Sequence, residues 1–495
     1  MDFEEYRRYD AVGLAALVAR GEVSAEALLE LALARSREVG PRINAIVHDL
    51  GDAALSQLAR RAPAGALAGV PFLVKDVSQD IEGVPTLAGS RALMDAVAPA
   101  TVTAVRRWME AGLIVFGKTA TLEFALKGIT EAHAYGATRN PWNLARTPGG
   151  SSGGAAAAVA AGIVPMAGAN DGGGSIRIPA AYCGLFGLRP SRGRVPMGPT
   201  YGELWEGASS DLVVSRSVRD SALALDLAQG ADVGAPFVIA PPQRPYLDEA
   251  AIDPPPLRIG VLTRSPIGTP VDAACVEAVD RTATLLESLG HHVEWAEPDI
   301  DGAALADSYL RMYFGQVAAD VERARRLTGR NDFEAETRAL AALGRSMNAG
   351  EYVASRRRWN VFARALGDYH QRYDLLMTPT VAMRAARIGE LELSSGKRLM
   401  ISLMLGLRAG RLALKSGMVR QLAQDSLQRT PFTQLSNLTG TPSMSVPLHW
   451  DGEGMPVGVQ FVAAFGGEDR LLQLAGQLER AQPWFDRVPT DSKVA

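Results

Sequence analysis

The chain has 495 residues, of which 47% are hydrophobic and 21% charged, and its net charge is -3. The length allows roughly two to four domains, or one large α/β domain with insertions. The absence of a long basic run disfavours a nucleic-acid partner, and no apolar run approaches the ~20 residues that a membrane span needs. The N-terminus has no apolar signal-peptide region. We therefore expect a cytoplasmic, globular protein.

The two cysteines, Cys183 and Cys275, cannot form a disulfide framework. No Cys/His cluster has the spacing of zinc ligands. The sequence thus gives no reason to expect a metal or an organic cofactor. Cys183 is interpreted as a core thiol rather than a nucleophile.

Residues 1–65 are predicted to form an N-terminal helical region, with Ser24 as the N-cap of a helix that Gly40-Pro41 ends. Residues 66–235 then alternate between short apolar runs and helical stretches. Residues 70–74 have the pattern of a buried strand. We also predict a helix at 103–111 and another strand at 114–116. The loop at 128–154 is followed by an alanine-rich helix at 155–161, a strand at 164–169 and a glycine loop at 170–175. Ser217 to Asp220 has a capping-box pattern at the start of a helix.

Residues 236–256 are rich in proline and are predicted to connect two parts of the fold. Residues 257–495 form the second part, beginning with a strand, helix and strand at 259–262, 272–289 and 292–295. A helical, lid-like insertion is expected at about 303–425, and 375–377 is a further strand. The alternation predicts an α/β fold with a large, mostly parallel or mixed, twisted central sheet covered on both faces by helices.

Two motif matches are rejected on their context. Gly112 to Thr119 matches the phosphate-binding string, but its intermediate residues are strand-forming instead of a flexible loop. Gly149 to Gly153 matches the nucleophile-elbow motif, but no strand is predicted before Ser151. None of the later histidines lies in a sequence context that marks it as the catalytic partner of a serine. A core strand and a plain loop are the better interpretations.

Two Gly/Ser loops flank the alanine-rich helix, and they carry the chemistry that we predict. Gly172, Gly173 and Gly174 precede Ser175, and such a run frees backbone N–H groups to converge as an oxyanion hole requires. A serine nucleophile needs a base, and neither loop contains a histidine. A buried Lys75 with a lowered pKa could act as that base through Ser151. The alternatives are two tight turns in a small-residue core and an exposed lysine at a strand end.

The order of these segments resembles the amidase signature family. The similarity runs from about residue 5 to about residue 480 and rests on Lys75-Asp76 after a strand, the loop Gly149 to Gly154 and the loop Asp171 to Arg177. The segments 431–433, 437–440 and 456–460 also resemble the family. One departure is Asn170, where many members have Thr or Ser.

The resemblance implies a role for each matching residue. Lys75 is the base, Ser151 is a bridging serine preceded by a cis peptide, and Ser175 is the nucleophile. The remaining implied residues are the oxyanion-hole glycines Gly172, Gly173 and Gly174, and the loop-supporting residues Asp171, Arg177 and Ser152. No cofactor is implied, and the enzyme would be a monomer or a homodimer.

Within the family, the chain looks most like amidases of linear or cyclic aminohexanoate oligomers, aryl-acylamidases and carbamate-cleaving members. The resemblance therefore implies an acyl-enzyme amidohydrolase acting on a small, neutral, fairly apolar amide, anilide or carbamate. Two alternatives remain: the glutaminase-type subunit of an amidotransferase that works with a partner, and a non-catalytic binding protein on the same scaffold.

The candidate substrate-binding residues lie outside these motifs. Loop aromatics often line pockets, although ordinary packing is an equally good interpretation. The apolar segment 399–407 could be a core helix, an interfacial helix or a lid, and its methionines and nearby glycines favour a lid or pocket wall. The candidates are Ile129, Thr130, Tyr135, Tyr201, Trp205, Leu403 and Met404.

Overall fold

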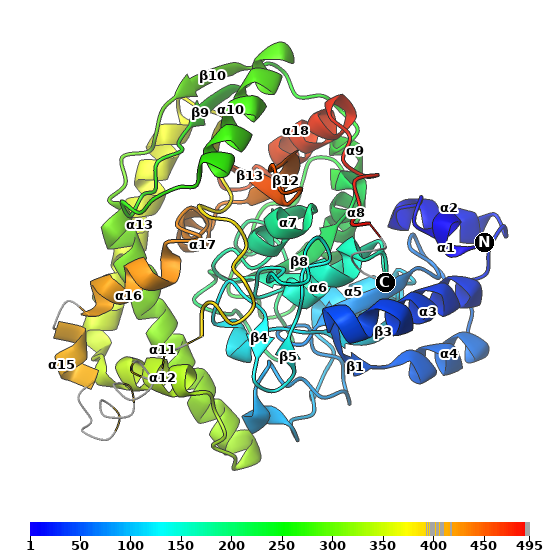
Figure 1. Ribbon diagram of the computed structural model, residues 1–495, viewed down its shortest axis with the longest axis horizontal. Coiled ribbons are helices and arrows are strands. Elements are labelled where there is room, and N and C mark those ends of the chain that lie inside the picture. The colour runs from blue at the N-terminus through cyan, green and yellow to red at the C-terminus, as the bar shows by residue number, and fades with distance from the viewer. Residues whose placement is uncertain are drawn as a thin grey trace.

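A computed structural model describes residues 1–392, 394, 396, 401, 405, 410–415 and 418–490. In this part of the chain, helices cover a sheet of eight strands in the order β10-β9-β11-β13-β12-β7-β8-β6 (Figure 1). Strand β10 is parallel to β9 and β9 to β11, and the other neighbours are antiparallel. The predicted α/β fold is confirmed, with a mixed sheet. In that order the strands span His292–Trp295, Arg258–Val261, Leu375–Pro379, Pro456–Ala463, Ser443–Trp450, Phe186–Arg189, Ser210–Ser215 and Met166–Asp171.

A smaller sheet continues the large one beyond β6. Its strands are β1 (Ile46–Asp49), β3 (Ile114–Thr119) and β2 (Pro71–Lys75), and β2 lies beside β6. The rejected phosphate-binding string is strand β3, as expected, and Lys118 is buried within it, where its ammonium donates to Thr86. The loop at 128–154 contains a two-stranded ribbon of β4 (Glu131–Ala132) and β5 (Gly136–Ala137). Two short 3-10 helices, η1 (Arg91–Leu93) and η2 (Glu123–Ala125), precede it.

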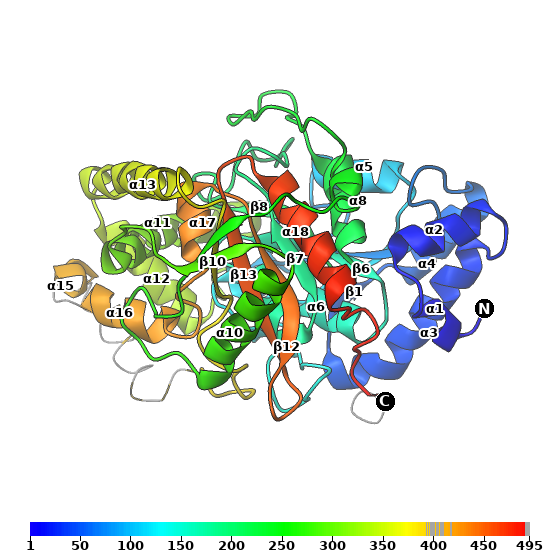
Figure 2. The ribbon, with the colours of Figure 1, turned by 90° about the horizontal axis from the view of Figure 1, so that it is seen from above.

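Helices lie on both faces of the sheet. Figure 2 shows α6 (Gly153–Ala160) and α10 (Ala273–Ser288) on one side of the strands, and α5 (Thr103–Glu110), α8 (Val218–Ala228) and α18 (Glu468–Ala481) on the other. Helix α7 (Arg177–Cys183) packs beside α6 and against β7, β12 and β13. All residues of α6 are buried, and a side chain at Gly154 would meet the backbone nitrogen of Ala120 at 2.4 Å. The small residues therefore allow α6 to approach the smaller sheet closely.

The N-terminal region forms α1 (Phe3–Tyr6), α2 (Ala11–Ala19), α3 (Ala25–Ile43) and α4 (Gly51–Arg60) at one end of the molecule (Figure 1). Ser24 caps α3 as predicted, but the helix continues through Pro41 to Ile43 and ends at a left-handed Asn44. Ser217 caps α8 by accepting from the N–H of Asp220. The reciprocal half of the capping box is absent, because the Asp220 carboxylate instead accepts from the N–H groups of Ala11 and Val12.

The helices after β10 pack in a second hydrophobic core around Phe314 and Trp359, to which Phe124, Leu126 and Ala208 of the first part of the fold also belong. The Pro-rich connection before β9 contains one short helix, α9 (Tyr246–Glu249). Strand β11 interrupts the predicted insertion and belongs to the main sheet. No helix in the described ranges is long and apolar enough to cross a bilayer. The helices are α11 (Gly302–Thr328), α12 (Ala335–Ser346), α13 (Ala349–His370), α15 (Gly410–Lys415), α16 (Met418–Leu427) and α17 (Gln434–Thr439).

Candidate active site

Lys75 and Ser151 are in direct contact in the interior of the protein. Lys75 is the last residue of β2, and its Nζ donates to Ser151 Oγ at 2.8 Å. Both side chains are fully buried, and the Gly150–Ser151 peptide bond is cis. A side chain at Gly150 would lie 2.2 Å from the carbonyl oxygen of Ile129, so only glycine fits before Ser151. The strand end and the loop thus bring together two residues that lie far apart in the sequence.

Burial changes the acid–base behaviour of Lys75. Desolvation lowers the pKa of its ammonium to about 7, although the carboxylates of Asp211 and Asp171 act in the opposite direction. The backbone N–H of Lys75 donates to the side chain of Gln79, which in turn donates to the carbonyl of Ala169 on β6. Gln79 therefore ties the lysine to the neighbouring strand, and near neutral pH a substantial part of Lys75 is the free amine.

Ser152 connects the Ser151 loop to the end of β6. Its hydroxyl donates to the carbonyl of Asn170 and accepts from the N–H of the same residue, both at 3.2 Å. The Asn170 amide in turn donates to Ser209 and to the buried carboxylate of Asp211. Burial raises the pKa of Asp211 to about 6. The departure from the family pattern at Asn170 thus has a structural partner, Asp211, on the adjacent strand β8.

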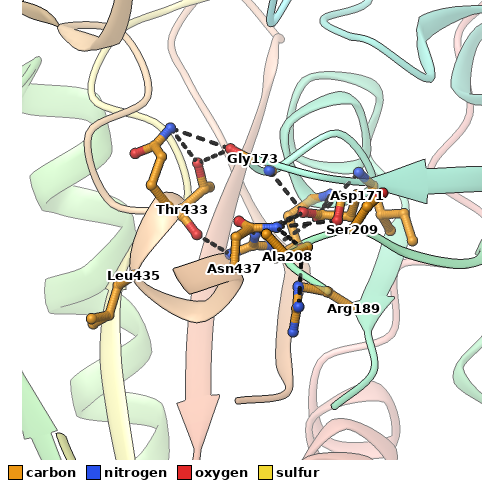
Figure 3. A network of polar contacts seen from close by, with 12 residues as sticks. Asp171, Gly173, Arg189, Ala208, Ser209, Thr433, Leu435 and Asn437 are labelled. Carbon is orange, nitrogen blue, oxygen red and sulfur yellow. Dashed lines mark hydrogen bonds and ion pairs between the residues drawn. The ribbon is translucent and has the colours of Figure 1, made fainter. Parts of the chain in front are cut away.

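The glycine loop that leads to Ser175 folds around the carboxylate of Asp171 (Figure 3). One oxygen of Asp171 accepts from the N–H of Gly174 at 2.7 Å, and the other accepts from the N–H of Ile176 at 3.2 Å. Arg177 donates two hydrogen bonds to the carboxylate, each 2.9 Å long. Although burial alone would raise the pKa of Asp171, the guanidinium of Arg177 holds it well below its usual range. Asp171 is therefore an anion that orders the loop.

Residues from the far C-terminal part of the chain complete this network. Asn437 on α17 donates to the carboxylate and to the carbonyl of Asp171 and accepts from Arg177. Thr433 donates to the carbonyl of Gly173 at 2.7 Å (Figure 3). Gln460 on β13 accepts from Arg177. These three residues belong to the segments 431–433, 437–440 and 456–460, which the resemblance also covered. Their hydrogen bonds thus anchor the glycine loop to the C-terminal part of the chain.

The backbone N–H groups of the glycine loop differ in whether they already have a hydrogen-bond acceptor. Gly174 uses its N–H for Asp171, so the expectation that it is an oxyanion donor is not met in this conformation. The carboxylate accepts it because the left-handed φ of +120° at Gly174 turns the chain around Asp171. The N–H groups of Gly172, Gly173 and Ser175 have no acceptor among the described residues. These three groups are available to a bound anion or carbonyl oxygen.

Two aromatic side chains lie against the glycine loop. A side chain at Gly172 would lie 2.9 Å from the ring of Trp205, and one at Gly173 would lie 2.1 Å from the hydroxyl of Tyr309. The ring of Tyr313 joins them, edge-on to Trp205 and stacked on Tyr309. Trp205 was a candidate from the sequence. Tyr309 was not, because it lies within the long helix α11 and nothing in its local sequence sets it apart from a core tyrosine.

The other candidate substrate-binding residues are placed differently. Thr130 is buried and supports the Ser151 loop, donating to Gly149 and accepting from Gly153. Ile129 is also buried and packs near Tyr135, whose hydroxyl donates to the carboxylate of Asp76. Tyr201 lies under the guanidinium of Arg323, 4.7 Å from the ring centre. Leu403 and Met404 lie outside the described residues.

The comparison with known proteins agrees with this architecture. A family model described as Amidase matches residues 27–472. The chain is 38% identical to 6-aminohexanoate-cyclic-dimer hydrolase of Pseudomonas sp. (strain NK87), over 97% of this chain and 96% of that protein.

Solved structures give the same result. A 6-aminohexanoate cyclic dimer hydrolase complexed with substrate superposes with a TM-score of 0.88 at 36% identity, covering 97% of this chain and 98% of that one. A bacterial aryl acylamidase of the amidase signature family superposes with a TM-score of 0.82 at 26% identity, with the same coverage. The chain therefore belongs to the amidase signature family, and it is a hydrolase that acts on amide C–N bonds.

Proposed function

We propose that this enzyme cleaves the C–N bond of a small, neutral, fairly apolar amide, anilide or carbamate through an acyl-enzyme on Ser175. In this proposal Ser151 relays protons and Lys75 is the general base. The observation that carries it is the 2.8 Å contact between Lys75 Nζ and Ser151 Oγ in a buried site, where the pKa of the lysine is about 7. Of the three side chains, Ser175 alone retains any exposure, at 9%, so it is the one that a substrate can reach.

The relay follows from the properties of the two serines and the lysine. A neutral Lys75 amine has a lone pair that can accept the hydroxyl proton of Ser151 over the observed distance. Ser151 then accepts the proton of Ser175 as the Ser175 oxygen bonds to the carbonyl carbon. When the tetrahedral intermediate collapses, the C–N bond breaks and the same relay returns the proton to the leaving nitrogen.

Hydrolysis of the acyl-enzyme repeats these steps with water. Water loses a proton into the relay as it attacks the ester carbonyl, and the ester oxygen of Ser175 regains a proton as it leaves. The products are the amine and the free acid (from a carbamate, a carbonic monoester, which breaks down to CO2 and the alcohol), and the three side chains return to their starting states. We assign stabilisation of the oxyanion to the N–H groups of Gly172, Gly173 and Ser175, because they have no acceptor within the described ranges.

The apolar character of the substrate is supported by the walls of the site and by the relatives. Trp205 and Tyr309 lie directly against the proposed oxyanion loop and offer aromatic surface, which favours an uncharged, apolar acyl or amine group. The names of two similar proteins refer to a cyclic aminohexanoate dimer and to aryl acylamides. Both are neutral amides with a large apolar part.

The decisive test is a search for the acyl-enzyme. The protein is mixed with a p-nitroanilide, and mass spectrometry is used to look for the acyl group on the peptide that contains Ser175. We expect a Ser175→Ala variant to lose turnover by several orders of magnitude and to carry no acyl group, with Ser36→Ala as a matched control on the surface helix α3. A folded Ser175→Ala variant that keeps more than a few per cent of activity would refute the assignment.

A substrate panel tests the proposed class. It contains p-nitroanilides, an aminohexanoate oligomer, a dicarbamate and glutamine. Turnover of the first three by the purified chain supports the proposal. Turnover of glutamine alone, and only with a partner protein, would instead identify an amidotransferase subunit, and no turnover at all would favour a binding protein.

A further inference from the structure

A cavity lies beside Gln434, a residue that donates to the carbonyl of Gly173 in the glycine loop. It encloses about 320 Å³ between the start of α11, the start of α17 and the strands β9, β11 and β13. Neither Lys75, Ser151 nor Ser175 lines it among the described residues. Leu435, which does line it, points away from the polar network around Asp171 (Figure 3). The cavity is therefore distinct from the site of the three proposed catalytic side chains.

The cavity wall combines apolar and polar side chains, and the polar ones include the amide of Gln434. The apolar part includes Leu305, Ala306 and Phe432. Gln434, which is 3% exposed, turns its Nε2 to the carbonyl of Gly173 at 3.2 Å. Its Oε1, on the other branch of the amide, has no donor in the part of the chain that the structure describes. An amide oxygen that no described residue donates to can accept a hydrogen bond from a ligand that supplies an N–H or O–H.

The mouth of the cavity favours the same kind of ligand. Arg264 and Glu297 form an ion pair at the rim, and the exposed carboxylate of Asp299 lies beside them. A second donor group on the ligand would find an acceptor there. The volume is ample for one aromatic ring, since a dry cavity of about 150 Å³ already holds benzene.

We propose that this cavity is a second small-molecule site that takes a neutral arylamine, the class of leaving group that an anilide releases. The ring contacts the apolar wall and the amine N–H donates to Gln434 Oε1. Because the same amide holds Gly173, occupancy of the cavity is coupled to the loop that precedes Ser175. The site therefore mediates inhibition by the amine product. The choice of an amine rests on the proposed function, but the existence of the site does not.

The test measures aniline binding by titration calorimetry in the Ser175→Ala protein, where no turnover occurs. We expect Ala306→Leu, which fills the cavity, to weaken aniline binding by about tenfold or more. Ala303→Leu is the matched control, because Ala303 is exposed on the same helix and does not line the cavity. Toluene, which has no N–H, should bind more weakly than aniline, and Gln434→Met should remove that difference.

Kinetics with the active enzyme provide the second measurement. Aniline should inhibit hydrolysis of a p-nitroanilide, and Ala306→Leu should relieve the inhibition while the uninhibited kcat/KM stays within about twofold. If Ala306→Leu does not fold, Ile267→Trp at the half-buried rim replaces it.

Two results would overturn the proposal. One is no aniline binding while hydrolysis is normal. The other is binding that Trp205→Ala removes and Ala306→Leu does not, which would place the amine at the catalytic loop. Either result leaves the assignment of Ser175 untouched, because that assignment depends on the acyl group and not on amine binding.

Discussion

Lys75 combines complete burial with contacts that only partly favour its charged form. Its ammonium donates to a neutral serine, and the carboxylates of Asp211 and Asp171 act on it without an ion pair in the described part of the chain. Asp171 is itself neutralised by Arg177. Since desolvation outweighs these carboxylates, the pKa of Lys75 falls to about 7 instead of rising.

We therefore predict that kcat/KM falls about tenfold per pH unit below pH 7 and levels off above it. The neutral amine is the active form, and protonation on the acidic side removes the base. Lys75→Ala should lose most activity over the whole range. Lys75→Arg is the sharper variant, because it keeps a cation but cannot deprotonate. A bell-shaped profile centred near pH 5, or full activity in either variant, would point to a different base.

Gly173 is a second residue at which the structure makes a sharp prediction. A methyl group at this position would lie 2.1 Å from Tyr309 Oη and 2.9 Å from Cζ. We expect Gly173→Ala to displace the loop and lower kcat by about 10²–10³-fold, as for loss of an oxyanion donor. Adding Tyr309→Phe removes the nearer atom and should restore part of the rate. If the double variant is no faster than Gly173→Ala, the steric explanation is wrong.

At this scale the sequence predicted the motif residues, and the resemblance pointed to the segments of Thr433 and Asn437, but no contact between a motif residue and its supporting residues was predicted. Lys75, Ser151, Ser175, Asp171 and Arg177 stand in local patterns of glycine, serine and charge that one can recognise in a single sequence. The residues that hold them do not: Gln79, Asp211, Tyr309, Thr433 and Asn437 come from separate elements and meet only in the folded chain. Their contacts depend on sheet register and helix packing.

At the scale of secondary-structure elements, the buried carboxylate of Glu123 connects η2 to α12. Glu123 accepts from the hydroxyl of Ser90 at 2.6 Å, from the N–H of Glu334 at 2.9 Å and from the hydroxyl of Thr337. Desolvation raises its pKa to about 7 despite these donors. Glu123 thus ties the loops beside β2 and β3 to the first helices of the insertion.

This arrangement predicts a pH-dependent contribution to stability. Between pH 4.5 and about 7 the folded protein binds the Glu123 proton and the unfolded chain does not, so stability decreases as pH rises through that window. The slope should be on the order of 1 kcal/mol per pH unit. Glu123→Gln should remove this component in denaturant unfolding followed at several pH values. Glu110→Gln, on the exposed face of α5, is the control, and equal slopes in both variants would contradict the prediction.

Elements with a local apolar pattern were predicted in type but shifted by one or two residues. The strand predicted at 70–74 spans Pro71–Lys75, the helix predicted at 155–161 spans Gly153–Ala160, and the strand predicted at 164–169 spans Met166–Asp171. Strand β1 was missed because four residues between two helices form a strand only by pairing with β3. The end of α3 was also missed, since Pro41 sits in the last turn, where the missing N–H costs little.

In the whole molecule, the elements that hold the proposed catalytic residues differ from the helices that flank them. The proposed catalytic residues are held by the two sheets, by α6 and α7, and by the returning segment from Thr433 to Gln460. The helices α11, α12 and α13 pack around a second core, which also includes Phe124 and Ala208, and α11 reaches the glycine loop through Tyr309. This division between a sheet-bound centre and a helical flank was predictable as an α/β fold with an insertion. The docking of α11 on the loop was not, because it depends on long-range packing.

The division leads to a last prediction about substrate choice, which concerns residues 399–418. Most of this segment lies outside the described residues, so its role as a lid or pocket wall stays a prediction from its methionine- and glycine-rich sequence. Its described part supports the idea. Helix α15, which lies within the segment, packs on α12, and α16, which begins at Met418, packs on α11, the helix that carries Tyr309. A wall in this position would contact the substrate and leave the chemistry to Ser175.

Leu403→Ala and Met404→Ala should therefore change the ranking of bulky against small amides, each by about 1–3 kcal/mol in relative kcat/KM, as for an altered apolar pocket contact. The burst of acylation with a small activated ester should change much less, because the proposed catalytic residues are untouched. Leu412→Ala is the matched control, since Leu412 is 71% exposed on α15. If the first two variants only lower Tm and keep the wild-type ranking, the segment is ordinary core, and substrate selection must be sought in Trp205 and Tyr309 instead.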